Sequence, residues 1–274
     1  MIMQNKVILI TGATSGIGYQ TAKLLAEQGY QVYGAGRRVD KLEPLKEIGV
    51  RSVKLDITDE DSIKSAVDQV IRQAGKIDVL INNAGYGSYG AIEDVSIEEA
   101  KRQFDVNLFG LAKLTQLVLP YMRKQKSGRI INTSSMAGRM TSYFGAWYHA
   151  TKYALEGFSD ALRMEVKQFG IEVALIEPGS IKTDWGLIAA NNLESSSKNG
   201  AYEVSAKKAA QGMRKLYLGK MVSDPIIISN AILKAVNKKK PRTRYLIGFG
   251  AKPLVFLHTI LPNRFFDYLM MHVV

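Results

Sequence analysis

Short apolar runs alternate with longer amphipathic stretches over the first 180 residues of the chain. Six of these runs have the length of buried strands and are bounded by Gly, Asn or Ser: 7–10, 31–36, 51–56, 77–85, 128–135 and 171–179. The amphipathic stretches between them predict helices, the clearest at 17–28, 59–74, 97–123 and 147–169. Near-continuous apolar strands that alternate with helices indicate a parallel sheet covered on both faces.

Such a sheet predicts a doubly wound α/β fold, because right-handed crossovers place helices on both faces. The ligand crevice of this fold lies at the carboxyl ends of the strands. We therefore look for chemistry in the residues that follow each predicted strand.

The pattern changes after Pro178. Residues 184–223 include the polar, small-residue run NNLESSSKNG, typical of a mobile insert, which we interpret as a substrate lid. A helix near 224–237 and a strand around 243–248 follow, and the apolar tail 251–274 is interrupted by two prolines. Because there is no internal repeat and no obvious linker, we interpret residues 1–274 as one domain with about seven strands.

Composition excludes several classes of site. The 274 residues contain no cysteine, so disulfides, thiolate metal sites and a cysteine nucleophile are impossible. The three histidines are not spaced like a paired metal site, so we expect no metal. Hydrophobic residues make up 46% and charged residues 23% of the chain, an ordinary balance for a globular protein.

The net charge of +12 raises the possibility of nucleic acid or an anionic membrane as a partner. No nucleic-acid module accompanies this charge, and we expect none to bind. The one basic cluster reads as a solvated helix end and turn: Lys238, Lys239, Lys240, Arg242 and Arg244. The tail has two interpretations, since it can pack over the substrate pocket or touch a membrane interface beside this cluster; packing is favoured. The N-terminal run MIMQNKVILI has no charged leader, which predicts a cytoplasmic protein.

The first strand leads into TGATSGIG, Thr11 to Gly18, and then into a helix. Glycines allow the backbone to turn sharply and to approach a pyrophosphate, whose charge is met by free N–H groups at the helix N-terminus. An ordinary tight turn gives the same pattern, but the order strand, loop, helix favours a nucleotide site. The glycine spacing differs from the usual G-x-G-x-x-G.

Tyrosine precedes lysine by four residues at two places, Tyr148–Lys152 and Tyr19–Lys23. Residues four apart share a helix face, and an ammonium group near a phenol favours its phenolate form. Only the first pair has a matching serine, because Ser135 lies thirteen residues earlier at the end of a predicted strand. We therefore predict that Tyr148 is the active tyrosine and that Tyr19 is a surface residue.

Taken together, TGxxxGIG, NNAG at 82–85, the serine after the fifth strand, YxxxK and PG at 178–179 resemble the classical short-chain dehydrogenases/reductases. The resemblance covers residues 5 to about 250, and the motifs come in the family's order. It implies a Rossmann-type domain that transfers hydride between a nicotinamide cofactor and a carbonyl or alcohol. It also implies a homodimer or homotetramer formed through the helices at 97–123 and 147–169, without deciding between the two.

The end of the second strand bears on the cofactor. NAD-selective folds usually place a carboxylate there for the ribose 2′-hydroxyl. This chain has Arg37 and Arg38 after Gly36, and guanidinium groups suit the 2′-phosphate of NADP(H). Ser15, where many NADP enzymes of the family carry a basic residue, weakens this preference without reversing it. We predict NADP(H).

By resemblance, Tyr148 donates or accepts the proton and Ser135 orients the substrate. Lys152 lowers the Tyr148 pKa and binds the ribose, and Asn107 holds a water that links Lys152 to solvent. Asn107 also has a local interpretation, as an asparagine that kinks its helix. The cofactor contacts implied by the family are Gly12, Thr14, Ser15, Gly16, Ile17, Gly18, Arg37, Arg38, Asp56, Ile57, Asn83, Ala84, Gly85, Tyr148, Lys152, Pro178, Gly179, Ile181 and Thr183.

The substrate is less constrained, because one fold serves many reactions. Met136 to Tyr143, the insert and the tail are expected to build the pocket, with Tyr143, Phe144, Trp185, Leu187 and Ile188 as candidate apolar walls. Such walls favour a lipophilic carbonyl. The tail and PRTRYLIG are similar to the branch of 17β-hydroxysteroid and retinol dehydrogenases, which suggests a steroid, retinoid or long-chain ketone. The main alternative is a non-catalytic NADPH sensor, although it would have no need of Ser135, Tyr148 and Lys152 together.

Overall fold

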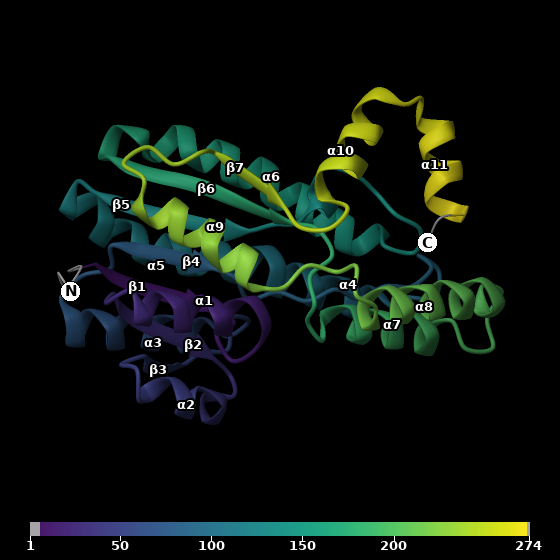
Figure 1. Ribbon diagram of the computed structural model, residues 1–274. Coiled ribbons are helices and arrows are strands. Elements are labelled where there is room, and N and C mark those ends of the chain that lie inside the picture. The colour runs from purple at the N-terminus through teal and green to yellow at the C-terminus, as the bar shows by residue number, and fades with distance from the viewer. Residues whose placement is uncertain (1–5, 273–274) are drawn as a thin grey trace.

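The computed structural model describes residues 6–272. The predicted absence of a leader depends on residues 1–5, and the predicted tail ends at 273–274; both segments lie outside the described residues. The sheet has seven parallel strands in the order β3-β2-β1-β4-β5-β6-β7, which confirms the predicted doubly wound fold (Figure 1). The strands are β1 Val7–Thr11, β2 Gln31–Gly36, β3 Arg51–Lys54, β4 Val79–Asn82, β5 Gly128–Thr133, β6 Ile171–Pro178 and β7 Arg244–Ile247.

Helices cover both faces of the sheet (Figure 1). One face is covered by α1 (Gly16–Glu27), α2 (Glu43–Lys46) and α9 (Ile226–Asn237), and the other by α3 (Glu60–Ala74), α5 (Gly110–Gln125) and α6 (Ala146–Val166). Strand β1 shows why its sequence is continuously apolar. Ile8 and Ile10 join the core under α1 and α9, whereas Val7 and Leu9 join the core on the opposite face. Side chains alternate along a strand, so a strand covered on both faces must be apolar at every position.

The helix predicted at 97–123 is interrupted. It consists of α4 (Ile97–Phe104), a π-helical segment at Asp105–Phe109 and α5, which begins at Gly110. A Cβ atom on Gly110 would lie 1.9 Å from the Ile57 backbone oxygen, so a glycine is required where the helix passes the end of β3. Wide turns of this kind occur frequently at functional sites, and Asn107 lies in this one.

Gly110→Ala is expected to destabilise the fold by roughly 1–3 kcal/mol, because the added methyl overlaps backbone that cannot rotate away. The matched control is Gly157→Ala in α6. An added Cβ meets nothing within 4 Å there, and alanine is the better helix former by about 1 kcal/mol. Chemical denaturation of both variants checks this, and equal midpoints would contradict it.

The segment 184–223, expected to be a mobile insert, contains two packed helices, α7 (Trp185–Ser196) and α8 (Glu203–Leu218). The polar run hid them because it covers the end of α7 and the turn that precedes α8. Small residues nevertheless make one shared face, where Ala189, Ala190 and Leu193 pack against Ala206 and Ala210. This pair stands beside the carboxyl ends of the strands (Figure 1).

The tail forms two helices, α10 (Ala251–Ile260) and α11 (Asn263–His272), which stand together at one end of the molecule (Figure 1). Val255, Phe266 and Met270 are buried in a cluster with Met140. Within residues 6–272, no helix combines the length and apolar character needed to cross a bilayer. In the predicted basic cluster, Arg244 is not a fully solvated charge: it lies in β7, is only partly exposed and forms ion pairs, because the chain enters the sheet there.

Candidate active site

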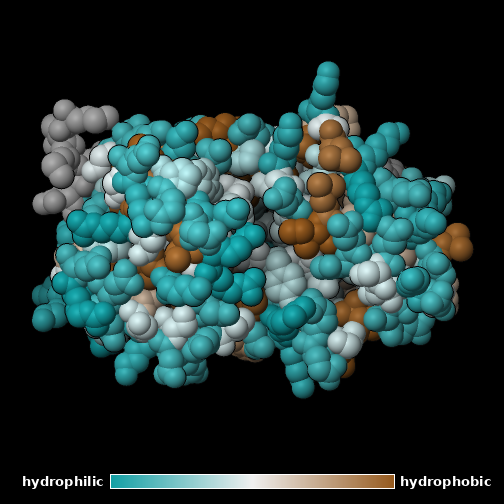
Figure 2. All heavy atoms as spheres, turned by 90° about the horizontal axis from the view of Figure 1, so that it is seen from below, coloured by the Kyte–Doolittle hydropathy of each residue, from teal (hydrophilic) through white to brown (hydrophobic). Residues whose placement is uncertain are grey.

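A cavity of about 1820 Å³ lies at the carboxyl ends of the strands. Sites for small ligands usually measure about 300–1,000 Å³, so this cavity has room for a dinucleotide and a substrate together. In Figure 2 the largest hydrophobic group on the surface lies right of centre, toward the end that carries α7, α8 and the tail. Most predicted cofactor contacts line the cavity: Gly12, Thr14, Ser15, Gly16, Ile17, Arg37, Arg38, Asp56, Ile57, Asn83, Ala84, Gly85, Tyr148, Lys152, Pro178, Gly179, Ile181 and Thr183.

Gly18, also predicted as a cofactor contact, does not line the cavity. A Cβ there would lie 2.2 Å from the Gly12 carbonyl oxygen, so its role is to let α1 pack closely beneath the loop. Gly12 and Gly16 adopt positive φ angles of 66° and 55°, a region that glycine tolerates. The loop thus brings backbone N–H groups at the start of α1 to the cavity, where they can meet a phosphate.

Thr11 and Asn83 hold the glycine loop against the end of β4. The Thr11 hydroxyl accepts hydrogen bonds from the backbone N–H groups of Asn83 and Ala84, both at 3.0 Å. The Asn83 amide donates in return to the Thr11 carbonyl at 3.1 Å. The sequence pattern marks Asn83 but gives no sign of the Thr11 contact, since a threonine at a strand end is common.

Arg37 and Arg38 are exposed at the end of β2 and line the cavity. Lys54 adds a third cation, and its ammonium donates to the Arg37 carbonyl at 2.7 Å. Hydrogen bonds from Thr58 hold the pKa of Asp56 below its usual range, and the charges of Arg37 and Lys54 act in the same direction. Asp56 is engaged locally by Thr58, so the guanidinium groups of Arg37 and Arg38 remain available to an anionic ligand.

Tyr148 is only 6% exposed and lies at the junction of the cavity's polar and apolar parts. Its ring centroid lies 5.0 Å from that of Trp185 and 5.8 Å from that of Tyr89. Burial raises the pKa of the Tyr148 hydroxyl, and a hydrogen bond with Ser135 lowers it. We expected Lys152 to lower this pKa; the largest influence on it is burial, which raises it, and Tyr89 and Tyr217 act in the same direction as burial. Tyr148 is therefore a protonated phenol that can act as an acid.

Lys152 is buried one helical turn further along α6. Its ammonium donates to the Thr133 carbonyl at 3.0 Å and lies 5.8 Å from the centroid of the Tyr148 ring. Desolvation lowers the pKa of Lys152 to about 8, and the Glu156 carboxylate acts in the opposite direction. A cation is therefore held beside the phenol with few water molecules to screen it.

Ser135 and Ser134 are distinguished by their contacts. The Ser135 hydroxyl accepts from the Ala137 N–H at 3.1 Å, donates to the Pro178 carbonyl at 3.4 Å, and hydrogen-bonds Tyr148. The Ser134 hydroxyl is buried near Gly138 and finds no hydrogen-bond partner within residues 6–272. The structure therefore brings together Ser135, Tyr148 and Lys152 as predicted.

Asn107 is 1% exposed and does not line the cavity. Its side-chain amide donates to the Tyr86 carbonyl at 2.9 Å and to the Thr151 hydroxyl at 3.1 Å, and its oxygen accepts from the Tyr86 N–H at 3.1 Å. The π-helical turn places these groups against α6 beside Lys152. These partners are distant in sequence, so Asn107 is not satisfied within its own helix but fastens the chain after β4 to α6.

His149 has a structural role that the sequence pattern did not reveal. The Ser142 N–H donates to His149 Nε2 at 3.0 Å, so Nδ1 carries the proton and donates to the Ala137 carbonyl at 2.9 Å. Burial lowers the pKa of this imidazole and favours the neutral ring. His149 therefore fixes both ends of the loop that follows Ser135.

The apolar end of the cavity differs in part from the predicted walls. Tyr143, Trp185 and Ile188 line it as predicted, with Met136 and Met140. Phe144 and Leu187 do not, because Phe144 turns into the cluster under α7 and α8, and Leu187 lies on another side of α7. The insert and the tail also line the cavity, as expected, through residues that were not singled out from the sequence: Met213, Leu216, Tyr217, Leu254, Met270 and Met271. Tyr89 lines it too and lies outside the predicted segments.

Comparison with known proteins gives a consistent result. The family model for short chain dehydrogenases matches residues 6–191. The chain is 38% identical to a probable short-chain type dehydrogenase/reductase from Helicobacter pylori, with 97% of each chain covered. It is 41% identical to a 3-ketodihydrosphingosine reductase from Bacteroides thetaiotaomicron, with 90% of this chain and 89% of that one covered.

Solved structures agree with this result. A short-chain dehydrogenase from Streptomyces avermitilis superposes with a TM-score of 0.80 at 33% identity, over 93% of this chain and 92% of that one. A 3-ketoacyl-(acyl-carrier-protein) reductase from Brucella melitensis, solved with NADH, gives 0.74 at 26% identity, over 87% and 94%.

Proposed function

This chain belongs to the short-chain dehydrogenase family, and we propose that it reduces a lipophilic carbonyl with NADPH, or oxidises the matching alcohol with NADP⁺. Membership supports a hydride-transferring oxidoreductase with a nicotinamide cofactor. One observation carries the finer proposal. Ser135, Tyr148 and Lys152 line one cavity between a glycine loop with two arginines and a set of apolar walls.

The residues of the chain suit the chemistry of reduction. When bound, NADPH supplies the hydride. Ser135 donates a hydrogen bond to the substrate carbonyl and holds it beside Tyr148. Tyr148, kept protonated by burial, donates its proton to the developing alkoxide. The Lys152 ammonium stabilises the phenolate that this transfer leaves. Asn107 holds the segment after β4 against α6 and so keeps these groups in register.

The preference for NADP(H) rests on charge. Arg37 and Arg38 lie exposed on the cavity where β2 ends, and their guanidinium groups can donate paired hydrogen bonds to a phosphate. Asp56 is hydrogen-bonded by Thr58.

Arg37→Ala is expected to weaken NADPH binding by about 10-fold or more, because charge-assisted hydrogen bonds are worth about 1.5–3 kcal/mol. NADH, which has no 2′-phosphate, should bind almost as before. Quenching of tryptophan fluorescence by the two cofactors measures both effects. An equal loss for NADPH and NADH would contradict the assignment.

The reduction rate should depend on the charge of Lys152. The pKa of Lys152 is lowered to about 8, so the lysine loses its proton as the pH rises through that value and the phenolate loses its support. We expect kcat/KM for reduction to fall above about pH 8, and Lys152→Arg to move the fall to higher pH because arginine stays charged. Profiles that coincide for the two proteins would contradict this.

The substrate class follows from the walls of the cavity. Trp185, Tyr217, Met213 and Met270 present apolar surface next to Tyr148, which suits a steroid, retinoid or long-chain ketone better than a sugar. The 3-ketodihydrosphingosine reductase among its relatives has a name consistent with a long-chain ketone. We also infer a homodimer or homotetramer, as the family implies.

The proposed function is tested by NADPH oxidation against a panel of steroid, retinoid and long-chain ketones, with NADH and polar sugars as matched controls. Turnover of lipophilic ketones with NADPH is the expected result. Tight NADPH binding without turnover of any carbonyl would instead support a cofactor sensor.

A further inference from the structure

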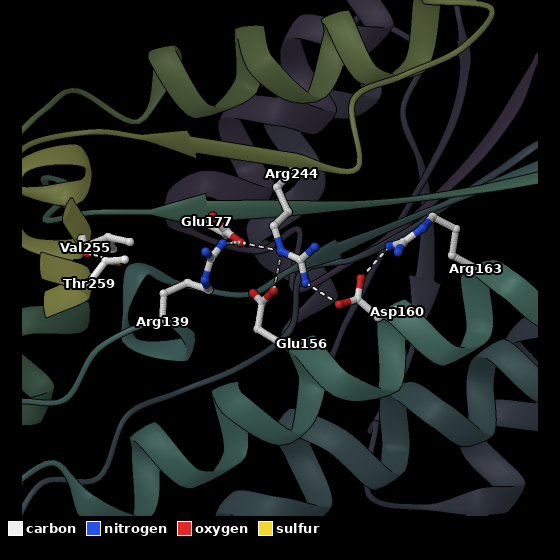
Figure 3. Close-up of polar contacts among 8 residues, drawn as sticks. All are labelled: Arg139, Glu156, Asp160, Arg163, Glu177, Arg244, Val255 and Thr259. Atoms are coloured by element: carbon white, nitrogen blue, oxygen red, sulfur yellow. Dashed lines mark hydrogen bonds and ion pairs between the residues drawn. The ribbon is translucent and has the colours of Figure 1, made fainter.

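Figure 3 shows a network of charged side chains. It joins four segments: the turn after Ser135, helix α6, strand β6 and strand β7. Its members are three carboxylates and three guanidinium groups, Glu156, Asp160, Glu177, Arg139, Arg163 and Arg244.

Arg244 is the centre of this network (Figure 3). Its Nε lies 3.0 Å from Glu156 Oε2 and 3.1 Å from Glu177 Oε1. Its Nη2 donates to Asp160 Oδ2 at 2.6 Å. One side chain from β7 therefore touches two carboxylates of α6 and one carboxylate of β6. Arg139 approaches Glu177 from the other side, at 3.4 Å.

These contacts fall beside the candidate catalytic groups. Glu156 is one helical turn after Lys152, and its charge raises the pKa of that lysine. Glu177 directly precedes Pro178, whose carbonyl accepts the Ser135 hydrogen bond. Arg139 closes the turn that begins at Ser135. The network thus connects the segments that carry Ser135, Lys152 and Pro178.

The two glutamates are also short of hydrogen-bond donors. Glu177 is fully buried, and one carboxylate oxygen of each, Glu156 Oε1 and Glu177 Oε2, is buried without a partner among the described residues. A buried carboxylate oxygen without a hydrogen-bond donor destabilises the fold, and protonation of the carboxyl group removes that penalty. Burial first, and then the Glu156 charge, raise the pKa of Glu177 to about 7, although Arg139 and Arg244 oppose them.

We propose that Arg244 is a positioning residue for the reaction, and that Glu177, with Glu156 beside it on Arg244, holds one exchangeable proton behind Lys152. This proposal rests on the proposed function only where it concerns catalysis. The groups that face the pair are Lys152 and Asp160 from α6, Arg139 from the turn and Arg244 from β7. Release of the proton adds negative charge beside Lys152 and keeps its ammonium form over a wider pH range.

The presence of this proton is tested by infrared spectroscopy of the protein without cofactor, so that no reaction is needed. The carbonyl band of a buried carboxylic acid should grow as the pH falls through about 7, and should be lost in Glu177→Gln. The matched control is Glu165→Gln, an exposed carboxylate on the same helix, which should leave the band unchanged. A wild-type spectrum without such a band, or a band that Glu177→Gln leaves intact, would overturn the proposal that Glu177 holds a proton.

The positioning role is tested by kinetics. Arg244→Gln should lower kcat roughly 10- to 100-fold with little change in the KM for NADPH, because displacement of α6 misaligns Tyr148. Adding Glu177→Gln should restore part of the loss, since it removes a carboxylate that Arg244 neutralised. Independent effects of the two changes would overturn the role. If Arg244→Gln does not fold, the kinetics of Glu177→Gln alone are measured instead.

A separate observation concerns the charge of the substrate. One face of α8 lines the cavity, through Ser205, Lys208, Ala209, Gly212, Met213, Lys215 and Leu216. Lys208 and Lys215 are seven residues apart, so they lie on the same side of the helix, about 10 Å apart along its axis. Both are lysines at an otherwise small or apolar face.

Neither lysine is neutralised by the protein. Over residues 6–272, Lys208 and Lys215 have no ion pair and no side-chain hydrogen bond, whereas Arg214 on the neighbouring face pairs with Glu194. The carboxylates that line the described part of the cavity are Asp56, at the nucleotide end, and Asp184. The substrate end thus carries excess positive charge within a largely apolar wall.

We infer that the substrate, within the proposed function, is an anionic amphiphile whose carboxylate or phosphate binds Lys208 and Lys215 while its apolar chain lies along Met213 and Met270. A cationic long-chain amine would be repelled by the same two lysines. The inference therefore separates two kinds of lipophilic ketone that the apolar walls alone do not distinguish.

Three long-chain ketones of equal length test it: a keto acid, its uncharged methyl ester and a keto amine. The acid should have the lowest KM. The double variant Lys208→Glu/Lys215→Glu should raise that KM about 10-fold or more and leave the ester unchanged. The control is Lys207→Glu, exposed on the same helix but outside the cavity.

Equal KM values for acid and ester in the wild type, or no effect of the charge reversal, would overturn the inference. If none of the ketones is turned over, the proposed function fails separately, and calorimetric binding of the acid and the ester to the NADPH-loaded protein still decides whether the lysines bind an anion.

Discussion

Tyr148→Phe is expected to lower the rate of carbonyl reduction by about 10²- to 10⁴-fold, the usual contribution of a general acid. The hydroxyl of Tyr148 is buried and protonated beside Ser135, so its removal leaves the developing alkoxide without a proton donor. Phenylalanine keeps the ring contacts with Trp185 and Tyr89, and the fold and NADPH binding should be retained. Single-turnover kinetics with saturating NADPH measure the loss.

Tyr19→Phe is the matched control, because Tyr19 also precedes a lysine by four residues but packs against the core on α1, outside the cavity. It should leave the rate unchanged. A Tyr148→Phe protein that binds NADPH and reduces the ketone at the wild-type rate would contradict the role given to Tyr148.

Lys152→Met is expected to lower kcat by roughly 10²-fold or more, because it removes a cation held beside the phenolate in a buried site. Lys152 is also expected to bind the cofactor ribose, so weaker NADPH binding should accompany the slower reaction. The substitution removes a donor to the Thr133 carbonyl as well. Rates and cofactor affinity are measured on the same preparation.

Lys23→Met serves as the control for Lys152→Met. Lys23 has the same spacing to a tyrosine, but its side chain is about half exposed and pairs with Glu27 at 3.9 Å. We expect no change in rate or affinity. Equal effects of the two substitutions would show that Lys152 acts only through its contribution to the fold.

The sequence predicts the sheet well because its central strands are covered on both faces, although the edge strand β3 is partly exposed. Strands such as β1 and β6 are apolar at nearly all positions, and no surface strand has that pattern. The choice of Tyr148 over Tyr19 also follows from chain order, since the structure places Ser135 and Tyr148 on the same cavity. Local pattern and fold agree at these positions.

Several features could not be predicted from the local sequence pattern. The π-helical turn around Asn107 depends on contacts with Tyr86 and Thr151, which are distant in sequence. Helices α7 and α8 present alanines to each other, so the apolar face that marks a helix is weak.

The pKa of Tyr148 depends on burial by aromatic rings from three segments, and spacing does not reveal burial. Arg244 illustrates the same limit, because a basic run in the sequence resembles solvated charge until β7 carries this residue between Glu156 and Glu177.

Direct hydride transfer is tested by the fate of deuterium at nicotinamide C4 of NADPH. The protein should be mixed with NADPH that carries deuterium on the transferred position and with a ketone that it reduces, and the product analysed by mass spectrometry. The account predicts one deuterium on the carbinol carbon of the alcohol, and the same label in the small amount of alcohol that Tyr148→Phe forms. Alcohol formed without deuterium from NADPH labelled in turn at each C4 position would contradict the central claim.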